Sequence, residues 1–173
     1  METSPHPLTI HYRPMTLQDV PRVHEIDTAS FSLPWSERSY RFELVENKNS
    51  VCWVAEVVDG KKVTVAGMIV IWAIIDEAHV ATIAVHPDFR GLGIGRTLLA
   101  RGLFEAYLRG ARLAFLEVRR GNLVAQQMYR KFGFQVVGER PRYYQDNNED
   151  ALLMTLEHIN PAVLEEFSKQ PDR

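Results

Sequence analysis

The sequence predicts one α/β domain in which a mixed β-sheet carries helices on both of its faces. Apolar runs typical of strands are interspersed with amphipathic runs typical of helices, which favours this class over an all-α or all-β one. The 173 residues, 46% of them hydrophobic, suffice for a single core. With no internal repeat or dividing linker, we assign the domain to residues 9–157 and expect terminal tails at 1–8 and 158–173, the second containing one helical turn.

The first part of the chain predicts a strand followed by two short helices. Apolar and polar residues alternate from Thr9, as in a half-buried strand. Thr16 and Asp19 have the spacing of a capping box, so a helix should begin there. The pattern breaks at Pro34, and Ser36 is a suitable N-cap for a second helix.

The rest of the chain predicts three strands, then two strand-and-helix alternations and a last strand. Asp59-Gly60 is a strong signal for a hairpin turn between the first two of these strands. Gly133 is expected to end the last helix. The expected strands are 52–58, 63–75, 78–86, 113–118, 134–139 and 149–157, and the expected helices are 97–109 and 122–132.

Composition limits the classes of partner and the compartment. The net charge of −2 gives no electrostatic argument for binding nucleic acid or a membrane surface. Cys52 is the single cysteine, which excludes an intrachain disulfide and favours a reducing compartment. The first residues lack the apolar core of a signal peptide, and the scattered histidines give no metal-binding spacing. We therefore expect a cytoplasmic protein without a metal.

The most distinctive stretch is R-G-L-G-I-G, from Arg90 to Gly95, between an expected strand and an expected helix. Glycines there let the backbone approach a ligand closely, and the amides and dipole of the following helix favour an anion. Arg90 and Arg96 add positive charge, so the loop indicates phosphate or pyrophosphate binding. The spacing fits neither the Walker loop nor the dinucleotide fingerprint. A glycine-rich turn without a ligand is the alternative.

This loop resembles the acyl-CoA loop of the GNAT N-acetyltransferases, and the order of elements resembles that fold over about residues 9–157. The resemblance implies a mostly antiparallel central sheet and acetyl-CoA as co-substrate. It implies that loop amides hold the pyrophosphate, that the preceding strand holds the pantetheine arm, and that an asparagine at the next helix start contacts the co-substrate. The corresponding residues are Ile83, Ala84, Val85, Arg90, Gly91, Leu92, Gly93, Ile94, Gly95, Arg96 and Asn122.

Acetyl transfer to an amine needs a base for the amine and an acid for the departing thiolate. Glu117 lies between Leu116 and Val118, and burial in this apolar strand would raise its pKa and make it a usable base. Tyr129, in the next helix, carries a phenol that could protonate the thiolate. From spacing alone, a solvent-facing carboxylate for Glu117 and a half-buried aromatic ring for Tyr129 are the favoured interpretations.

The stretch L-E-V-R-R-G-N-L-V-A-Q-Q-M-Y-R-K-F-G-F resembles one branch of the family, the ribosomal-protein alanine N-acetyltransferases. There, the resemblance implies that Glu117 is the general base, acting through water, and Tyr129 the general acid. The segments S-F-S-L-P-W-S and G-E-R-P-R-Y-Y also match, and Gly121 and Met128 depart from the usual residues. The two loops that would close over the acceptor contain Leu33, Pro34, Trp35, Tyr143 and Tyr144.

We therefore expect an N-terminal protein acetyltransferase, with the N-terminal alanine of a small-subunit ribosomal protein as acceptor. An α-amine with a pKa of about 8 is partly neutral at pH 7, whereas lysine, at about 10.4, is almost wholly charged. One carboxylate acting through water suits the α-amine better. Two alternatives stay open: an acetyltransferase of a small-molecule amine or a lysine side chain, and an acyl-CoA-binding module without turnover.

Overall fold

The computed structural model of the chain describes residues 7–169, which form an α/β fold with one sheet. The strands are β1 (Thr9–Pro14), β2 (Ser50–Asp59), β3 (Lys62–Ile74), β4 (Glu77–Val85), β5 (Leu113–Arg119), β6 (Gln135–Tyr144) and β7 (Glu149–Leu156). The helices are α1 (Val20–Ser30), α2 (Glu37–Val45), α3 (Ile94–Leu108), α4 (Leu123–Phe132) and α5 (Pro161–Lys169).

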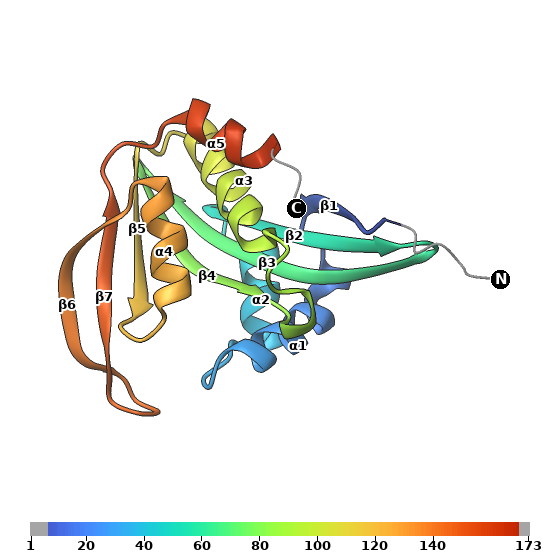
Figure 1. The fold of residues 1–173 in the computed structure, drawn as a ribbon, viewed down its shortest axis with the longest axis horizontal. Coiled ribbons are helices and arrows are strands. Elements are labelled where there is room, and N and C mark those ends of the chain that lie inside the picture. The colour runs from blue at the N-terminus through green and yellow to red at the C-terminus, as the bar shows by residue number, and fades with distance from the viewer. Residues whose placement is uncertain (1–6, 170–173) are drawn as a thin grey trace.

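The sheet has the strand order β1-β2-β3-β4-β5-β7-β6. Neighbouring strands are antiparallel except β4 and β5, which are parallel. Their pairing covers only Glu77–His79 against Leu113–Phe115, and beyond it the two strands diverge (Figure 1). The mixed, mostly antiparallel sheet expected from the sequence is confirmed, and its one parallel pair is interrupted after three residues.

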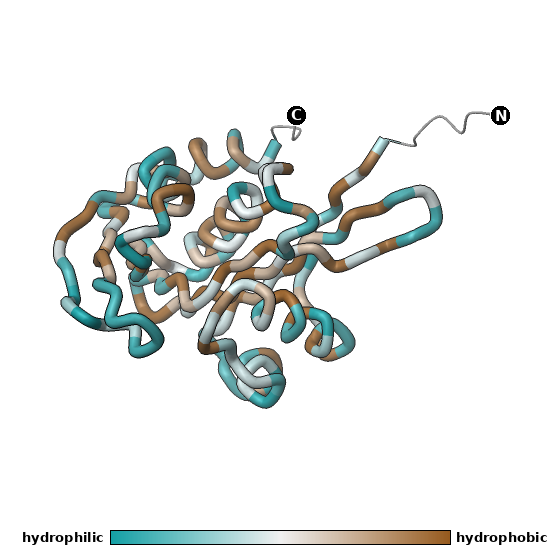
Figure 2. The backbone as a smooth tube through the Cα atoms, turned by 60° about the horizontal axis from the view of Figure 1, so that its bottom comes forward, coloured by the Kyte–Doolittle hydropathy of each residue, from teal (hydrophilic) through white to brown (hydrophobic). Residues whose placement is uncertain are grey.

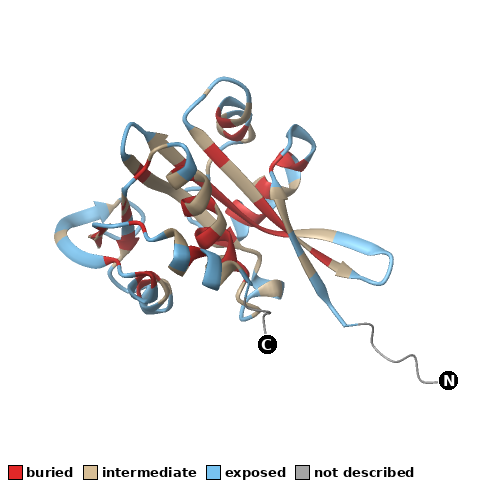
Figure 3. Ribbon diagram, turned by 90° about the horizontal axis from the view of Figure 1, so that it is seen from above, coloured by how far each residue is buried: buried red, intermediate tan, exposed pale blue. Residues whose placement is uncertain are grey.

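Helices cover both faces of this sheet. Helices α3, α4 and α5 lie on one face, and α1 and α2 lie on the other (Figure 1). Each face has its own apolar core, one around Leu98, Leu103 and Met154 and a smaller one around Ile26 and Met68. Apolar residues concentrate along the strands and the inner sides of the helices (Figure 2), and buried residues gather in the middle of the sheet (Figure 3).

The local signals read from the sequence fix the ends of several elements. The carboxylate of Asp19 accepts a hydrogen bond from the backbone N–H of Thr16, as a capping box requires. The Ser36 hydroxyl accepts one from the N–H of Ser39 at the start of α2. Gly133 ends α4 in the left-handed conformation, with a φ of 99°. These three predictions are confirmed.

Three segments differ from the expectation. Helix α3 begins at Ile94, within the glycine stretch rather than after it, and β6 continues to Tyr144. Residues 161–169, expected as a tail with one turn, form the whole helix α5, which buries Leu164 and packs Phe167 against Phe132 with 4.6 Å between ring centroids. The remaining expected tail residues, 1–6 and 170–173, lie outside the described residues. Between residues 7 and 169 no helix has the length and apolar character needed to cross a membrane.

Candidate active site

The candidate site lies where β4 and β5 separate. The last residues paired between these strands are His79 and Phe115, so the edge of β4 from Val80 to Val85 has no partner on the β5 side. A bulge leaves Ala81 unpaired with β3, which bends β4 at the same level. The free edge presents backbone N–H and C=O groups in the pattern of a strand, and an extended ligand with amide groups can pair with it.

The glycine loop follows directly from this edge. Gly91 and Gly93 have φ values of 82° and 77°, a region that side chains with a Cβ rarely adopt, and Gly93 is the N-cap of α3. The helical ladder starts with the N–H of Thr97, which donates to the carbonyl of Gly93 at 3.1 Å. The N–H groups of the first turn therefore have no acceptor within the helix, and an anion can bind there.

Arg90 fixes the start of the loop. Its Nε donates to the carbonyl of Val85 at 2.9 Å, and its terminal nitrogen donates to the hydroxyl of Ser30 at 3.2 Å. The arginine therefore links the end of β4 to the end of α1. A Cβ on Gly95 would lie 3.6 Å from the sulfur of Met128, so the loop also lies against α4.

Asn122 is the N-cap of α4, where its side-chain oxygen accepts a hydrogen bond from the N–H of Ala125 at 3.2 Å. The sequence places it at this helix start correctly, and its contact with a co-substrate stays a prediction. Just before it, the N–H of Gly121 donates to the carboxylate of Glu149 at 2.7 Å. A Cβ on Gly121 would meet this carboxylate oxygen at 2.8 Å, so the glycine makes room for Glu149.

Glu117 lies on β5, two residues beyond the last pair with β4. The expectation that this carboxylate is buried is wrong, because successive residues of a strand face opposite sides: Leu116 and Val118 are buried, whereas Glu117 is exposed. Its carboxylate lies 3.4 Å from the guanidinium of Arg140 on β6. The apolar neighbours in sequence therefore do not surround the carboxylate in space.

Tyr129 projects from α4 into the larger core. It is 5% exposed and lies 5.9 Å from the ring of Phe134, centroid to centroid. Burial raises the pKa of its phenol well above the ordinary value, and the neighbouring Tyr144 raises it further. A phenol in this environment keeps its proton at neutral pH.

Tyr143 and Tyr144 have different surroundings, although they are adjacent. Tyr143 is 42% exposed and its hydroxyl donates to the carboxylate of Glu117, which raises the pKa of Tyr143 together with partial burial. Tyr144 is half-buried under the guanidinium of Arg119, and burial raises its pKa to about 12 although this cation opposes the shift. Tyr143 is therefore the tyrosine that faces Glu117, and Tyr144 supports it with an edge-on ring contact at 5.2 Å.

The loop between α1 and α2 borders the site from the other side. Leu33 and Pro34 are exposed, whereas Trp35 packs on Tyr40 and Trp72 at centroid distances of 5.3 and 6.3 Å. The buried carboxylate of Asp27 accepts a hydrogen bond from the backbone N–H of Trp35 at 2.7 Å, and burial raises the pKa of Asp27. The tip of this loop reaches the β6–β7 turn, where the side chain of Ser32 bonds the Asp146 carboxyl and helps to lower its pKa.

The structure thus brings together residues that are far apart in the sequence. Glu117 and Tyr143 meet directly, Tyr129 lies near Tyr144, and the two loops meet at Ser32 and Asp146. Trp35 lines a pocket between α2 and β3.

Sequence reasoning missed the basic residues that organise the site. Arg119 donates to the Asp146 and Glu149 carboxylates at 3.0–3.3 Å, and Arg140 pairs with Glu117. The signal that could have found Arg119 is the acidic run D-N-N-E-D, whose charge complements the R-R pair at the end of β5. Arg140 is exposed, and its guanidinium also lies 5.5 Å from the centroid of the Tyr143 ring.

Comparisons with known proteins agree with this geometry. Residues 20–134 match the model of the Acetyltransferase (GNAT) family. A Bacillus subtilis protein provisionally named a ribosomal protein bS18-alanine N-acetyltransferase is 42% identical over 82% of this chain and 91% of its own length. The Escherichia coli enzyme named ribosomal protein bS18-alanine N-acetyltransferase is 32% identical over 80% of this chain and 90% of its own.

Comparison of the fold with solved structures gives a similar result. A crystal structure of the ribosomal-protein-S18-alanine N-acetyltransferase from Escherichia coli superposes with a TM-score of 0.75 and 28% identity, over 88% of this chain and 95% of the other. The family match extends from α1 through the glycine loop and β5 to the end of α4, the segments that carry most of the candidate site. The chain therefore belongs to the Acetyltransferase (GNAT) family, whose enzymes take the acetyl group from acetyl-CoA.

Proposed function

We propose that this acetyltransferase acetylates the free α-amine of a protein, and that its acceptor is the N-terminal alanine of ribosomal protein bS18. The observation that carries the proposal is the position of Glu117. Its carboxylate lies just beyond the point where β4 and β5 separate, beside the hydroxyl of Tyr143 and the guanidinium of Arg140. Two relatives named for bS18-alanine acetylation, at 42% and 32% identity, support the choice of acceptor.

The residues of the β4 edge and the glycine loop suit acetyl-CoA. Ile83, Ala84 and Val85 lie on the free edge, where amide groups of the pantetheine arm can pair with the backbone. The amides from Arg90 to Arg96 surround the start of α3, where the pyrophosphate would bind, and Asn122 lies at the start of α4. Acetyl-CoA supplies the acetyl thioester and a thiolate leaving group.

The chemical step follows from two side chains with different surroundings. Glu117, accessible to solvent, takes a proton from the acceptor amine through a water molecule. The amine nitrogen then forms a bond to the acetyl carbon, and the carbon–sulfur bond of the thioester breaks. Tyr129, whose raised pKa keeps its phenol protonated, gives a proton to the departing sulfur. The thioester oxygen is stabilised by N–H groups of the free β4 edge.

The two loops suit a peptide with a free end. Leu33 and Pro34 are exposed at the tip of the α1–α2 loop, and Tyr143 is exposed on β6. The contact of Ser32 with Asp146 joins these two loops. A single chain terminus can enter between them more easily than the middle of a folded protein. Because the acceptor is a ribosomal protein, we place the enzyme in the cytoplasm.

The test is mass spectrometry of the products formed from acetyl-CoA and one lysine-containing peptide that starts with alanine. The peptide is supplied with its α-amine free and with it blocked. We expect acetylation of the free form alone, loss of at least a hundredfold in kcat in Glu117→Gln, and little change in Glu157→Gln, an exposed carboxylate at the other end of β7. Acetylation of both forms would show that the acceptor is a lysine side chain. Acetylation of neither form would leave two functions: acetylation of a small-molecule amine, or binding of acyl-CoA without turnover.

A further inference from the structure

A pocket of about 380 Å³ lies between α2 and β3, on the sheet face that carries α1 and α2. We propose that it binds a basic side chain of the acceptor protein, at one of positions 3–5 counted from the acetylated residue as position 1. The inference rests on the proposed function and assigns a specificity site to it. It is carried by one buried carboxylate, by the aromatic side chains around it, and by the position of the pocket relative to Glu117.

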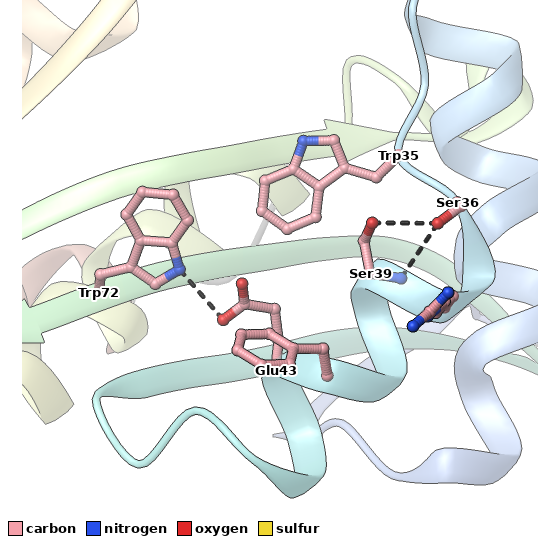
Figure 4. Close-up of a pocket in the computed structure, with 7 residues that line it drawn as sticks. Trp35, Ser36, Ser39, Glu43 and Trp72 are labelled. Carbon is pink, nitrogen blue, oxygen red and sulfur yellow. Dashed lines mark hydrogen bonds between the residues drawn. The ribbon is translucent and has the colours of Figure 1, made fainter.

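The carboxylate belongs to Glu43 on α2, which is only 7% exposed. One of its oxygens, Oε2, accepts hydrogen bonds from Asn47, Ser50 and the indole of Trp72, at 2.6–3.1 Å. The other, Oε1, accepts none from residues 7–169, and the carboxylate points into the space between Trp35 and Trp72 (Figure 4). Its known partners are all neutral donors, so a negative charge is held at the pocket without a compensating cation.

The side chains around this carboxylate favour an organic cation. Trp35, Trp72 and Phe42 line the pocket, and aromatic rings attract ammonium and guanidinium groups. Ser36 and Ser39 add hydroxyl groups to the lining of the pocket. A buried carboxylate next to indole rings is suited to the head of a lysine or arginine side chain, whose methylene stem can lie against the rings.

Arg38 also lines this pocket, and its charge must be weighed. It is exposed and forms no ion pair with Glu43 or with any other residue in the described part of the chain. The exposed guanidinium of Arg38 is screened by water and salt, whereas the Glu43 carboxylate is only 7% exposed and is held in place by three neutral donors. The inner charge therefore decides which ligand is preferred.

A row of rings connects the pocket to the site of reaction. Trp72 on β3 pairs in register with His79 on β4, and His79 pairs with Phe115 on β5. The rings of His79 and Phe115 stack at 5.2 Å, and all three side chains share the sheet face. Glu117 lies two residues beyond Phe115 on β5 and faces the same way.

This row sets the distance between the amine and the cation. Two strand spacings of about 4.8 Å and two residues along β5 separate Glu117 from Trp72 by roughly 12 Å or more, because β5 diverges from β4 beyond Phe115. An extended peptide covers about 3.3 Å per residue, so the side chain that reaches the pocket is about the fourth. A range of three to five residues allows for the length of lysine and arginine side chains.

The experiment uses a set of peptides that start with alanine and are otherwise neutral. Each peptide carries a single lysine or arginine, placed in turn at positions 2 to 7. We expect the peptide with its basic residue at one of positions 3–5 to have a KM about tenfold lower than the neutral peptide. Glu43→Gln, which keeps an acceptor for the three donors, should bring this ratio close to one. Glu46→Gln removes a charge from the exposed end of the same helix and should keep it.

Ser39→Tyr provides a second test, because it fills the pocket and leaves Glu43 in place. It should abolish the preference as Glu43→Gln does. No position dependence, a preference for an acidic residue, or a preference that survives both variants would overturn the inference.

Binding of the same peptides, measured by calorimetry without acetyl-CoA, separates this failure from failure of the proposed function. Peptides that are acetylated without a basic preference refute the pocket assignment alone. Peptides that bind with the preference, and are never acetylated, refute the proposed function alone.

Discussion

The guanidinium of Arg119 lies 3.9 Å from the centroid of the Tyr144 ring. The same group donates to both carboxylate oxygens of Asp146 and to Glu149. Arg119 therefore ties the β6–β7 turn to the end of β5, the strand that carries Glu117. The position of the tyrosine pair relative to the proposed base is set by this arginine.

We predict that Arg119→Lys weakens acceptor binding without affecting acetyl-CoA. Lysine keeps the positive charge, but its ammonium group is not planar. It cannot stack on the Tyr144 ring and donate to the Asp146 and Glu149 carboxylates at the same time. Steady-state kinetics should show an increase of about tenfold in the KM for an alanine-starting peptide, corresponding to about 1.4 kcal/mol. An unchanged KM for this peptide, or an equal rise in the KM for acetyl-CoA, would contradict this role.

The raised pKa of Tyr129 predicts the shape of the pH profile. A general acid acts in its protonated form, so its activity is lost as the pH rises through its pKa in the folded protein. Because burial moves this pKa above the ordinary value of about 10, kcat/KM should rise through the pKa of the α-amine, about 8, and show no decline up to pH 10.

Tyr129→Phe should lower kcat at least a hundredfold across this range. The control is Tyr107→Phe on α3, a half-buried tyrosine beside Arg112, which should behave like the natural protein. A decline in rate centred below pH 9 would show that another group is the acid.

Two glycines with positive φ allow loop function to be separated from backbone strain. Gly93 has a φ of 77° in the loop, and Gly110 has a φ of 113° between α3 and β5, away from the site. Alanine at either position should lower the free energy of unfolding by about 1 kcal/mol, measured by urea denaturation. Gly93→Ala alone should raise the KM for acetyl-CoA. If Gly110→Ala raises it equally, the loop has no special part in binding.

Helix α5 should contribute to stability and not to the reaction. Leu164 is 2% exposed, and truncating a buried leucine to alanine costs about 2–4 kcal/mol. Leu164→Ala should therefore unfold at a lower temperature, as measured by circular dichroism, and retain its kcat at temperatures where it is folded. The matched control is Glu166→Ala, at an exposed position of the same helix, and it should unfold at the same temperature as the unsubstituted protein.

Local chemistry explains what the sequence could predict. The capping box of Thr16 and Asp19, the N-cap at Ser36 and the stop at Gly133 depend on neighbours within a few residues, and each is confirmed. Helix α3 was expected to start after the glycines, because glycine disfavours helix interiors. Gly95 lies in the first turn of α3, where that cost is smaller.

The surroundings of the site depend on contacts that sequence spacing cannot show. Arg119 and Asp146 are 27 residues apart, and Arg140 reaches Glu117 across the sheet. The burial of Glu117 was inferred from its apolar neighbours, which face the opposite side of the strand. The length of α5 was underestimated because a nine-residue amphipathic segment is marginal alone and forms a helix through its contact with the core.

The short pairing of β4 with β5 has a mechanical consequence. Strands β1–β4 and strands β5–β7 form two leaves, each made of a continuous part of the chain, joined in the sheet by three residue pairs at one end. The glycine loop extends from the first leaf, and Glu117, Tyr143 and Arg119 belong to the second. The separation of thioester and amine therefore depends on the angle between the leaves, so a change in packing at the joined end can alter the reaction from a distance.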